Sequence, residues 1–256
     1  MKKYKGYLID LDGTMYRGTE SIEGAAEFVD ELSGKGIPYL FVTNNSSKTQ
    51  EDVSNKLNSM GIAASPDQVV TTSLATANYI RSRKENARCF VIGEEGLVQA
   101  LESAGMTIAE SECDFVVTGI DRQVTYEKFT KACLEVRNGA RFISTNSDIA
   151  IPTERGLLPG NGALTSVVTV STGQSPTFIG KPEAIIMEEA LAILGLAKEE
   201  TLMVGDNYHT DITAGIHAGM DTLMVFTGVT PFEELERLSI PPTHYVHDLR
   251  EWIGSM

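Results

Sequence analysis

Short apolar runs recur along the whole chain, and they limit its fold more than any other feature. They lie at residues 7–9, 39–42, 90–92, 115–117, 142–143, 178–179, 202–204 and 222–226. Continuous runs of this length are typical of strands that are buried on both faces, as in a parallel sheet. The runs therefore predict several parallel strands.

Helical patterns lie between these runs, at residues 25–32, 49–60 and 183–194. The last two are followed by Gly61 and Gly195. Glycine commonly ends a helix because it adopts the left-handed conformation at the C-terminal cap. The alternation of strands and helices predicts an α/β fold with a doubly wound parallel sheet.

The chain is acidic, with a formal net charge of −14 over 256 residues. This charge disfavours nucleic acid and anionic membrane surfaces as partners. It also repels phosphorylated metabolites, so a site for one needs local positive charge from a lysine or a metal ion. No apolar run approaches the roughly 20 residues that span a bilayer, no secretory signal is recognisable, and the three cysteines form no C-x-x-C pair. We therefore expect a cytoplasmic protein with reduced thiols.

Polar side chains follow four of the apolar runs directly. Ligands of an open parallel sheet bind at the carboxyl ends of its strands, so these side chains are candidates for one common site. They are Asp10 and Asp12, then Thr43 with Asn44 and Asn45, then Lys181, and finally Asp206 with Asn207 and Asp211.

Asp10 and Asp12 have the spacing of a nucleophile and a proton donor. Residues i and i+2 of an extended segment point to the same side, and Gly13 allows a sharp turn beside them. A carboxylate that attacks phosphorus divides hydrolysis into two easier displacements. We expect Asp10 to attack, and Asp12 to protonate the leaving alcohol and later to deprotonate water.

The predicted site needs a divalent cation. Its four carboxylates bring four negative charges against one positive charge from Lys181, so a dianionic phosphate enters only if a cation is bound. Oxygen ligands and phosphate chemistry favour Mg²⁺. We expect Asp10 and Asp206 to bind it through their side chains and Asp12 through its main-chain carbonyl.

The remaining polar residues are expected to support the metal ligands or to hold the phosphate. Asp211 and Asn207 are predicted to lie next to the metal ligands and to orient them without binding the metal themselves. Thr43, Asn44, Asn45 and Lys181 are predicted to hold phosphate oxygens.

The four segments resemble the four motifs of the haloacid dehalogenase superfamily, in its phosphatase branch. They are D-x-D-G-T at residues 10–14, Thr43, Lys181 and G-D-x-x-x-x-D at residues 205–211. More locally, residues 43–46, 118–121 and 159–162 are similar to the NagD-like phosphatases, which include 4-nitrophenylphosphatase-type and sugar-phosphatase enzymes. The second aspartate of the first motif, Asp12, favours phosphate over halide chemistry.

The resemblance implies a smaller α/β cap domain inserted between the second and third motifs. We expect the catalytic core at residues 1–85 and 177–256 and the cap at residues 86–176. Asn146 and Asp148 are predicted to reach the substrate from the cap. Asn161 stands where such sequences often carry alanine, and we expect its side chain in a loop that faces the substrate.

The sequence thus predicts a Mg²⁺-dependent phosphomonoesterase that acts on small phosphorylated metabolites. The resemblance implies sugar phosphates, sugar-acid phosphates or nucleotides, with arylphosphates as surrogates in vitro. Two alternatives stay open: a phosphotransferase or mutase that uses the same intermediate, and a non-catalytic protein that binds a phosphorylated metabolite. A cap-mediated homodimer is compatible with the resemblance.

Overall fold

The computed structural model describes residues 2–153 and 155–256, which divide into two compact units. The first comprises Met1–Thr43, Gln50–Val70 and Lys181–Met256. The second comprises Asn44–Thr49 and Thr71–Gly180.

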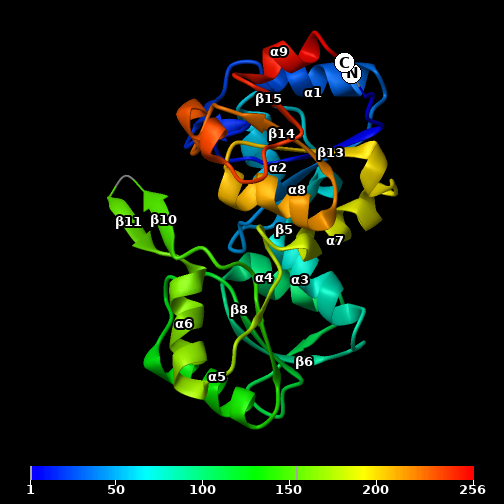
Figure 1. Cartoon of the computed structure of the whole chain (residues 1–256). Coiled ribbons are helices and arrows are strands. Elements are labelled where there is room, and N and C mark those ends of the chain that lie inside the picture. The colour runs from blue at the N-terminus through cyan, green and yellow to red at the C-terminus, as the bar shows by residue number, and fades with distance from the viewer. Residues whose placement is uncertain (1, 154) are drawn as a thin grey trace. The chain divides into compact units, whose positions relative to one another are not determined.

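The first unit is built on a six-stranded sheet with the order β15-β14-β13-β1-β4-β5 (Figure 1). The strands are β1 (Gly6–Ile9), β4 (Tyr39–Thr43), β5 (Val69–Thr71), β13 (Thr201–Gly205), β14 (Asp221–Val225) and β15 (His244–Val246). The pairings between neighbouring strands from β15 through β4 are all parallel. The carboxyl ends of β1, β4 and β13 therefore meet at one edge of the sheet.

Helices cover both faces of this sheet. They are α1 (Ala25–Gly34), α2 (Gln50–Ser59), α7 (Ala184–Leu194), α8 (Thr213–Ala218) and α9 (Leu249–Ile253). Tyr7 and Ile9 of β1 join the core that Phe28 of α1, Leu57 of α2 and Trp252 of α9 also enter. The opposite face of the sheet contacts α7 and α8, and Gly215 of α8 lies close to Met203 of β13.

Shorter elements complete the first unit. They are the hairpin β2 (Tyr16–Arg17) and β3 (Glu20–Ser21), the 3₁₀ turns η1 (Pro66–Gln68), η2 (Lys198–Glu200) and η4 (Phe232–Arg237), and the π-helical turn η3 (Tyr208–Ile212).

The second unit has its own five-stranded sheet with the order β12-β9-β8-β6-β7. Its strands are β6 (Arg88–Ile92), β7 (Thr107–Ile108), β8 (Phe115–Thr118), β9 (Arg141–Ser144) and β12 (Thr177–Phe178), and all pair in parallel. Its helices are α3 (Thr72–Arg81), α4 (Glu95–Ser103), α5 (Tyr126–Arg137) and α6 (Asn161–Thr172). An antiparallel hairpin of β10 (Ala150–Thr153) and β11 (Gly156–Pro159) precedes α6.

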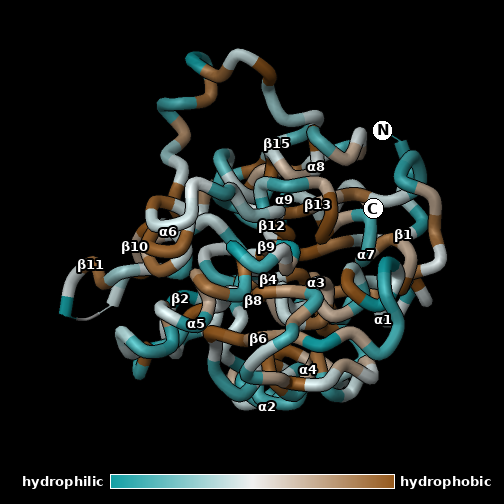
Figure 2. The backbone as a smooth tube through the Cα atoms, turned by 90° about the horizontal axis from the view of Figure 1, so that it is seen from below, coloured by the Kyte–Doolittle hydropathy of each residue, from teal (hydrophilic) through white to brown (hydrophobic). Residues whose placement is uncertain are grey.

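The predicted α/β class with parallel sheets and helices is confirmed. The apolar runs form strands in both units, and they appear as the brown stretches of β1, β13 and β6 in Figure 2. No helix in the described part of the chain is both long and apolar enough to cross a membrane.

The second unit begins earlier along the chain than the range 86–176 that was expected for a cap. It also contains Asn44–Thr49 and α3. The reason is tertiary packing: α3 contacts α4, and the main-chain N–H of Ile120 donates to Ser46 Oγ at 3.1 Å. Local sequence does not reveal where a helix docks, and a substrate-selecting role for this unit remains a prediction.

Candidate active site

Three carboxylates gather at the carboxyl edge of the first unit's sheet. Asp10 follows β1, Asp206 follows its parallel neighbour β13, and Asp211 lies in η3. All three are buried, and each offers an oxygen atom within 4.8 Å of the others. A small divalent cation fits such a set of oxygen ligands.

Lys181 supplies the positive charge inside this cluster. Its side chain is almost fully buried, at 3% exposed, and forms ion pairs with Asp10 and with Asp211 Oδ1, the latter at 2.7 Å. Its ammonium also donates to the main-chain oxygen of Val42 at 3.2 Å. Burial alone would lower the pKa of Lys181, but the two carboxylates raise it above its ordinary value. The lysine is therefore held as a cation.

The cluster still carries more negative than positive charge. Burial raises the pKa of Asp10 well above its usual range, and the charge of Asp211 adds to this shift, whereas Lys181 opposes it. Burial and then Asp211 raise the pKa of Asp206 to about 6. A bound divalent cation would offset this excess and would favour the ionised carboxylates.

Asp206 is fixed by the turn of the first motif and by a second loop. Thr14 Oγ1 donates to Asp206 Oδ1 at 3.0 Å and to Asp10 Oδ2 at 3.3 Å. The main-chain N–H of Val229 donates to Asp206 Oδ2 at 2.6 Å. A Cβ atom at Gly13 or at Gly228 would collide with the Asp206 carboxyl group, so both positions need glycine.

Asn207 and Asp211 support this arrangement. The Asn207 main-chain N–H donates to Asp211 Oδ2 at 3.0 Å, and the Asn207 side-chain oxygen accepts from the N–H of His209 at 3.0 Å. Asp211 thus bonds both the loop after β13 and Lys181.

Asp12 lies two residues beyond Asp10 and is exposed. Partial loss of water raises the pKa of its carboxyl group, and the positive charge of Lys56 opposes this rise. Lys56 belongs to α2, and its Nζ lies 3.8 Å from the centre of the Tyr16 ring. The sequence alone does not single out Lys56, because its pattern is that of an ordinary lysine of an amphipathic helix.

Thr43 ends β4, whose neighbour β1 leads to Asp10. The first unit therefore brings together Asp10, Thr43, Lys181, Asp206 and Asp211 at one edge of its sheet, as the motifs predict. Asn44 and Asn45, which follow Thr43 directly, belong to the second unit.

Comparisons with known proteins agree with this geometry. Residues 7–107 match the family model of haloacid dehalogenase-like hydrolases, and residues 178–252 match a second model of HAD-like hydrolases. The 5'-nucleotidase YutF of Bacillus subtilis is 64% identical over 99% of both chains. The acid sugar phosphatase of Staphylococcus aureus is 58% identical and covers 100% of this chain and 99% of its own.

The chain belongs to the haloacid dehalogenase-like hydrolases. A p-nitrophenyl phosphatase from Archaeoglobus fulgidus has a solved structure that superposes with a TM-score of 0.94 at 35% identity, with 100% of both chains covered. These relatives confirm the predicted resemblance to NagD-like phosphatases, and this chain is a hydrolase of phosphoric monoesters. A divalent metal is general among hydrolases of this family, and the aspartate cluster is compatible with one.

In this hydrolase, the second unit places Asn44, Asn146 and Asp148 together. Asn44 Nδ2 donates to Asp148 Oδ2 at 3.2 Å, and Asn146 Nδ2 donates to the main-chain oxygen of Asn44 at 2.8 Å. Asn45 has a different role, because its side-chain oxygen accepts from the N–H groups of Ser47 and Lys48, both at 2.9 Å. The structure therefore places Asn45 as a turn-forming residue.

The expectation that Asn161 lies in a loop is wrong, because this residue begins α6 and its side chain is buried. This side chain is 1% exposed, and its Nδ2 reaches Ser144 Oγ at 3.0 Å, Thr145 Oγ1 at 3.1 Å and the main-chain oxygen of Asn146 at 2.9 Å. Asn161 begins α6, and this helix start packs closely on the main chain of residues 147–150. It therefore positions the segment that carries Asn146.

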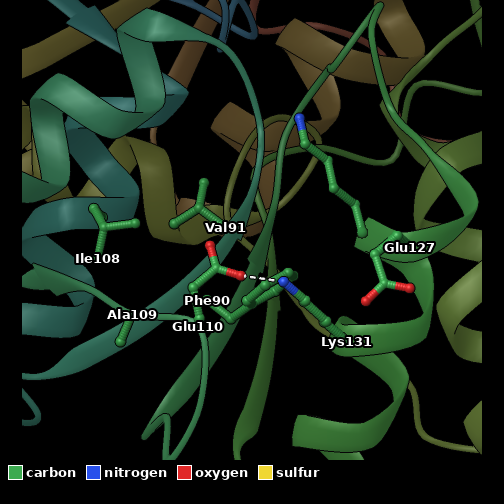
Figure 3. A pocket seen from close by; sticks show the side chains of 8 residues that line it. Phe90, Val91, Ile108, Ala109, Glu110, Glu127 and Lys131 are labelled. Atoms are coloured by element: carbon green, nitrogen blue, oxygen red, sulfur yellow. Dashed lines mark hydrogen bonds and ion pairs between the residues drawn. The ribbon is translucent and has the colours of Figure 1, made fainter.

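The hydrolase also has a hollow of about 240 Å³ within the second unit (Figure 3). None of the predicted site residues lines it. Lys131 pairs with Glu110 at 2.6 Å and Lys128 with Asp121 at 2.5 Å, so both lysines are already neutralised by acids of the same unit. Its lining residues are Phe90, Val91, Ile108, Ala109, Glu110, Glu127, Lys128 and Lys131.

Proposed function

We propose that this hydrolase is a Mg²⁺-dependent phosphomonoesterase of small phosphorylated metabolites, with Asp10 as the nucleophile. The observation that carries the proposal is the buried cluster of Asp10, Asp206 and Asp211 around Lys181. Phosphoryl transfer depends mainly on positioning and on neutralisation of charge, and this cluster offers both.

Lys181 and Thr43 bind oxygens of the phosphoryl group in the first step. The Asp10 carboxylate attacks phosphorus, a bond forms between Asp10 and phosphorus, and the bond to the alcohol oxygen breaks. Asp12 gives its proton to the departing alcohol. The ion pair with Lys181 favours the ionised form of Asp10, which burial alone would disfavour.

Water completes the reaction in the second step. Asp12, now ionised, takes a proton from water, and the water oxygen attacks the phosphorus atom. The bond between phosphorus and Asp10 breaks, and orthophosphate is released. Proton transfer by a positioned carboxyl group contributes about 10²–10⁴ to such a rate.

The side chains of Asp10 and Asp206 and the main-chain carbonyl of Asp12 would hold Mg²⁺. When bound, the cation supplies charge that offsets the phosphate oxygens and the carboxylates. Asp211 and Asn207 would keep the ligands in place through the hydrogen bond between them. Oxygen ligands favour Mg²⁺ over softer metals.

Candidate substrates come from the names of the relatives, which act as a 5'-nucleotidase, an acid sugar phosphatase and p-nitrophenyl phosphatases. For this chain the proposal covers sugar phosphates, sugar-acid phosphates and nucleotides, with arylphosphates as surrogates. The second unit would act as the cap that selects among them, through Asn44, Asn146 and Asp148. A cytoplasmic location and a homodimer remain predictions.

The test measures orthophosphate release from a panel of phosphorylated metabolites and 4-nitrophenyl phosphate. Each compound is assayed with Mg²⁺ and with EDTA, for the wild type and for Asp10→Asn. Mg²⁺-dependent release that disappears in the variant is expected. If a folded wild-type protein with bound Mg²⁺ releases no orthophosphate from any compound, the proposal is wrong. Phosphate that appears on a second metabolite would indicate a phosphotransferase instead.

A further inference from the structure

Lys56 is a further cation of the first unit, and unlike Lys181 it has no carboxylate partner among the described residues. Its side chain is half-buried, and its ammonium lies 3.8 Å from the centre of the Tyr16 ring. Within residues 2–153 and 155–256 its ammonium forms no ion pair or hydrogen bond. Lys5, by contrast, pairs with Glu200 at 2.6 Å. The three N–H donors of Lys56 are therefore available to a ligand.

Tyr16 connects this cation to the first motif. A backbone bridge joins Tyr16 to Asp12, and the N–H of Gly13 donates to the Tyr16 main-chain oxygen at 2.8 Å. The side chain is 7% exposed, yet its hydroxyl has no hydrogen-bond partner among the residues that the structure describes. The Tyr16 hydroxyl oxygen is also not among the fully buried side-chain atoms that lack a hydrogen-bond partner, so it keeps some access to solvent. It is thus a further donor beside Lys56.

The two lysines act on different carboxylates of the motif. Lys181 pairs directly with Asp10, whereas the charge of Lys56 acts on Asp12 without a direct ion pair in the described chain. Asp12 is the proposed proton donor to the leaving alcohol. The contact of Lys56 with Tyr16, which a backbone bridge joins to Asp12, therefore places this cation near the proposed proton donor.

We propose that Lys56 and the Tyr16 hydroxyl bind a carboxylate on the leaving alcohol, so that the enzyme prefers phosphomonoesters of hydroxy acids. This inference rests on the proposed phosphatase function and adds a specificity determinant that lies in the first unit. A chain with a net charge of −14 repels a substrate with a second anionic group. A cation near the proposed proton donor offsets that repulsion and accepts the carboxylate in charge-assisted hydrogen bonds.

The test compares two substrates that differ only in the group of interest. 3-Phosphoglycerate carries a carboxylate where glycerol 3-phosphate carries a hydroxymethyl group. The measured quantity is the ratio of their kcat/KM values. We expect Lys56→Met to lower this ratio by about tenfold or more, the loss that one hydrogen bond to a charged group implies. Lys56→Arg should retain most of the ratio, and Tyr16→Phe should lower it less.

Lys5→Met is the matched control, because it removes the same charge from a lysine paired with Glu200. It should leave the ratio unchanged. If Lys56→Met reduces both kcat/KM values equally, Lys56 acts only through Asp12 or through the fold, and the proposal is overturned. An unchanged ratio overturns it too.

A binding measurement separates this inference from the proposed chemistry. In the Asp10→Asn background, calorimetry with 3-phosphoglycerate should give a Kd about tenfold higher after Lys56→Met. Equal Kd values in the two proteins would contradict the inference even if the phosphatase activity is real. Absence of orthophosphate release by the wild type from both substrates and from 4-nitrophenyl phosphate would instead contradict the phosphatase proposal.

Discussion

The two units have the same architecture but bury different polar groups. Both contain a parallel sheet, yet the first buries the charged cluster of Asp10, Asp206, Asp211 and Lys181. The second buries the neutral network around Asn161 and Ser144, and its buried carboxylates, Asp121 and Glu135, belong to no such cluster within the described part of the chain. Buried charges contribute little net stability, while hydrogen bonds in a neutral network fix local structure. In this network the Asn161 Nδ2 group makes the hydrogen bonds, whereas its Oδ1 has no partner among the described residues. The difference indicates that the first unit retains its charges for chemistry and that the second uses its amides to hold a loop.

The largest expected effect compares a buried carboxylate in each unit. Asp10→Asn removes the proposed nucleophile, and we expect kcat to fall by at least about 10⁴-fold, as for nucleophiles of other hydrolases. Glu135→Gln, the matched change in the second unit, alters a carboxylate that accepts the N–H of Cys113 at 2.8 Å. It should reduce stability with little change in kcat.

Steady-state assays on 4-nitrophenyl phosphate, with circular dichroism to verify folding, check both variants. If Glu135→Gln abolishes turnover in a folded protein, the buried carboxylate of the second unit is not merely structural, and the proposed difference between the two units is wrong.

Metal binding offers a second way to sharpen the comparison. Asp206→Asn replaces a fully buried carboxylate that is a proposed ligand, and the Mg²⁺ concentration for half-maximal activity should rise by about 10–100-fold or more, since even supporting groups have effects of this size. Titration of activity with Mg²⁺ measures this. Asp148→Asn in the second unit is the control and should leave the Mg²⁺ requirement unchanged. Equal metal requirements in wild type and Asp206→Asn would exclude Asp206 as a ligand.

The neutral network of the second unit is expected to act on stability. Asn161→Ala leaves several buried acceptors without their donor, and this should lower the free energy of unfolding by about 1–3 kcal/mol. Urea denaturation measures the loss. Ser166→Ala, on the exposed side of the same helix, is the control and should change stability little. A loss of stability no greater than that of the control would show that the Asn161 amide does not hold the loop.

The smallest expected effect is a pH dependence of metal affinity. Because the pKa of Asp206 is raised to about 6, this carboxylate becomes protonated as the pH falls below that value, and a protonated carboxyl group binds Mg²⁺ poorly. Between pH 7.5 and pH 5.5 the Kd for Mg²⁺ should rise by at least about fourfold, which is the change in the ionised fraction of Asp206 alone. The raised pKa of Asp10 acts in the same direction. Calorimetry without substrate measures it and avoids the titration of substrate phosphate. A Kd that falls at the lower pH would contradict the prediction that protonation of Asp206 weakens Mg²⁺ binding.

The sequence predicted that the charged residues lie together because they directly follow apolar strands. Asp10, Thr43 and Asp206 each lie at or just beyond the end of a parallel strand, and such ends meet at one edge in any sheet of this type. Lys56 and Val229 were missed, because neither follows a motif and both act through contacts with distant segments. Asn161 was expected in a loop, because the Pro-Gly-Asn-Gly segment around it is typical of an exposed turn, but it begins a helix.

The sequence by itself determined the α/β class, the strand-end aspartates and the family. Periodicity and short motifs are local properties, and they can be identified in the sequence without knowledge of the packing. Only the tertiary structure decided that Lys181 meets Asp10, which lies 171 positions earlier, that Asn161 is buried, and that α3 belongs to the second unit. Such features depend on contacts between residues that are remote in sequence, and burial and charge pairing are set by those contacts.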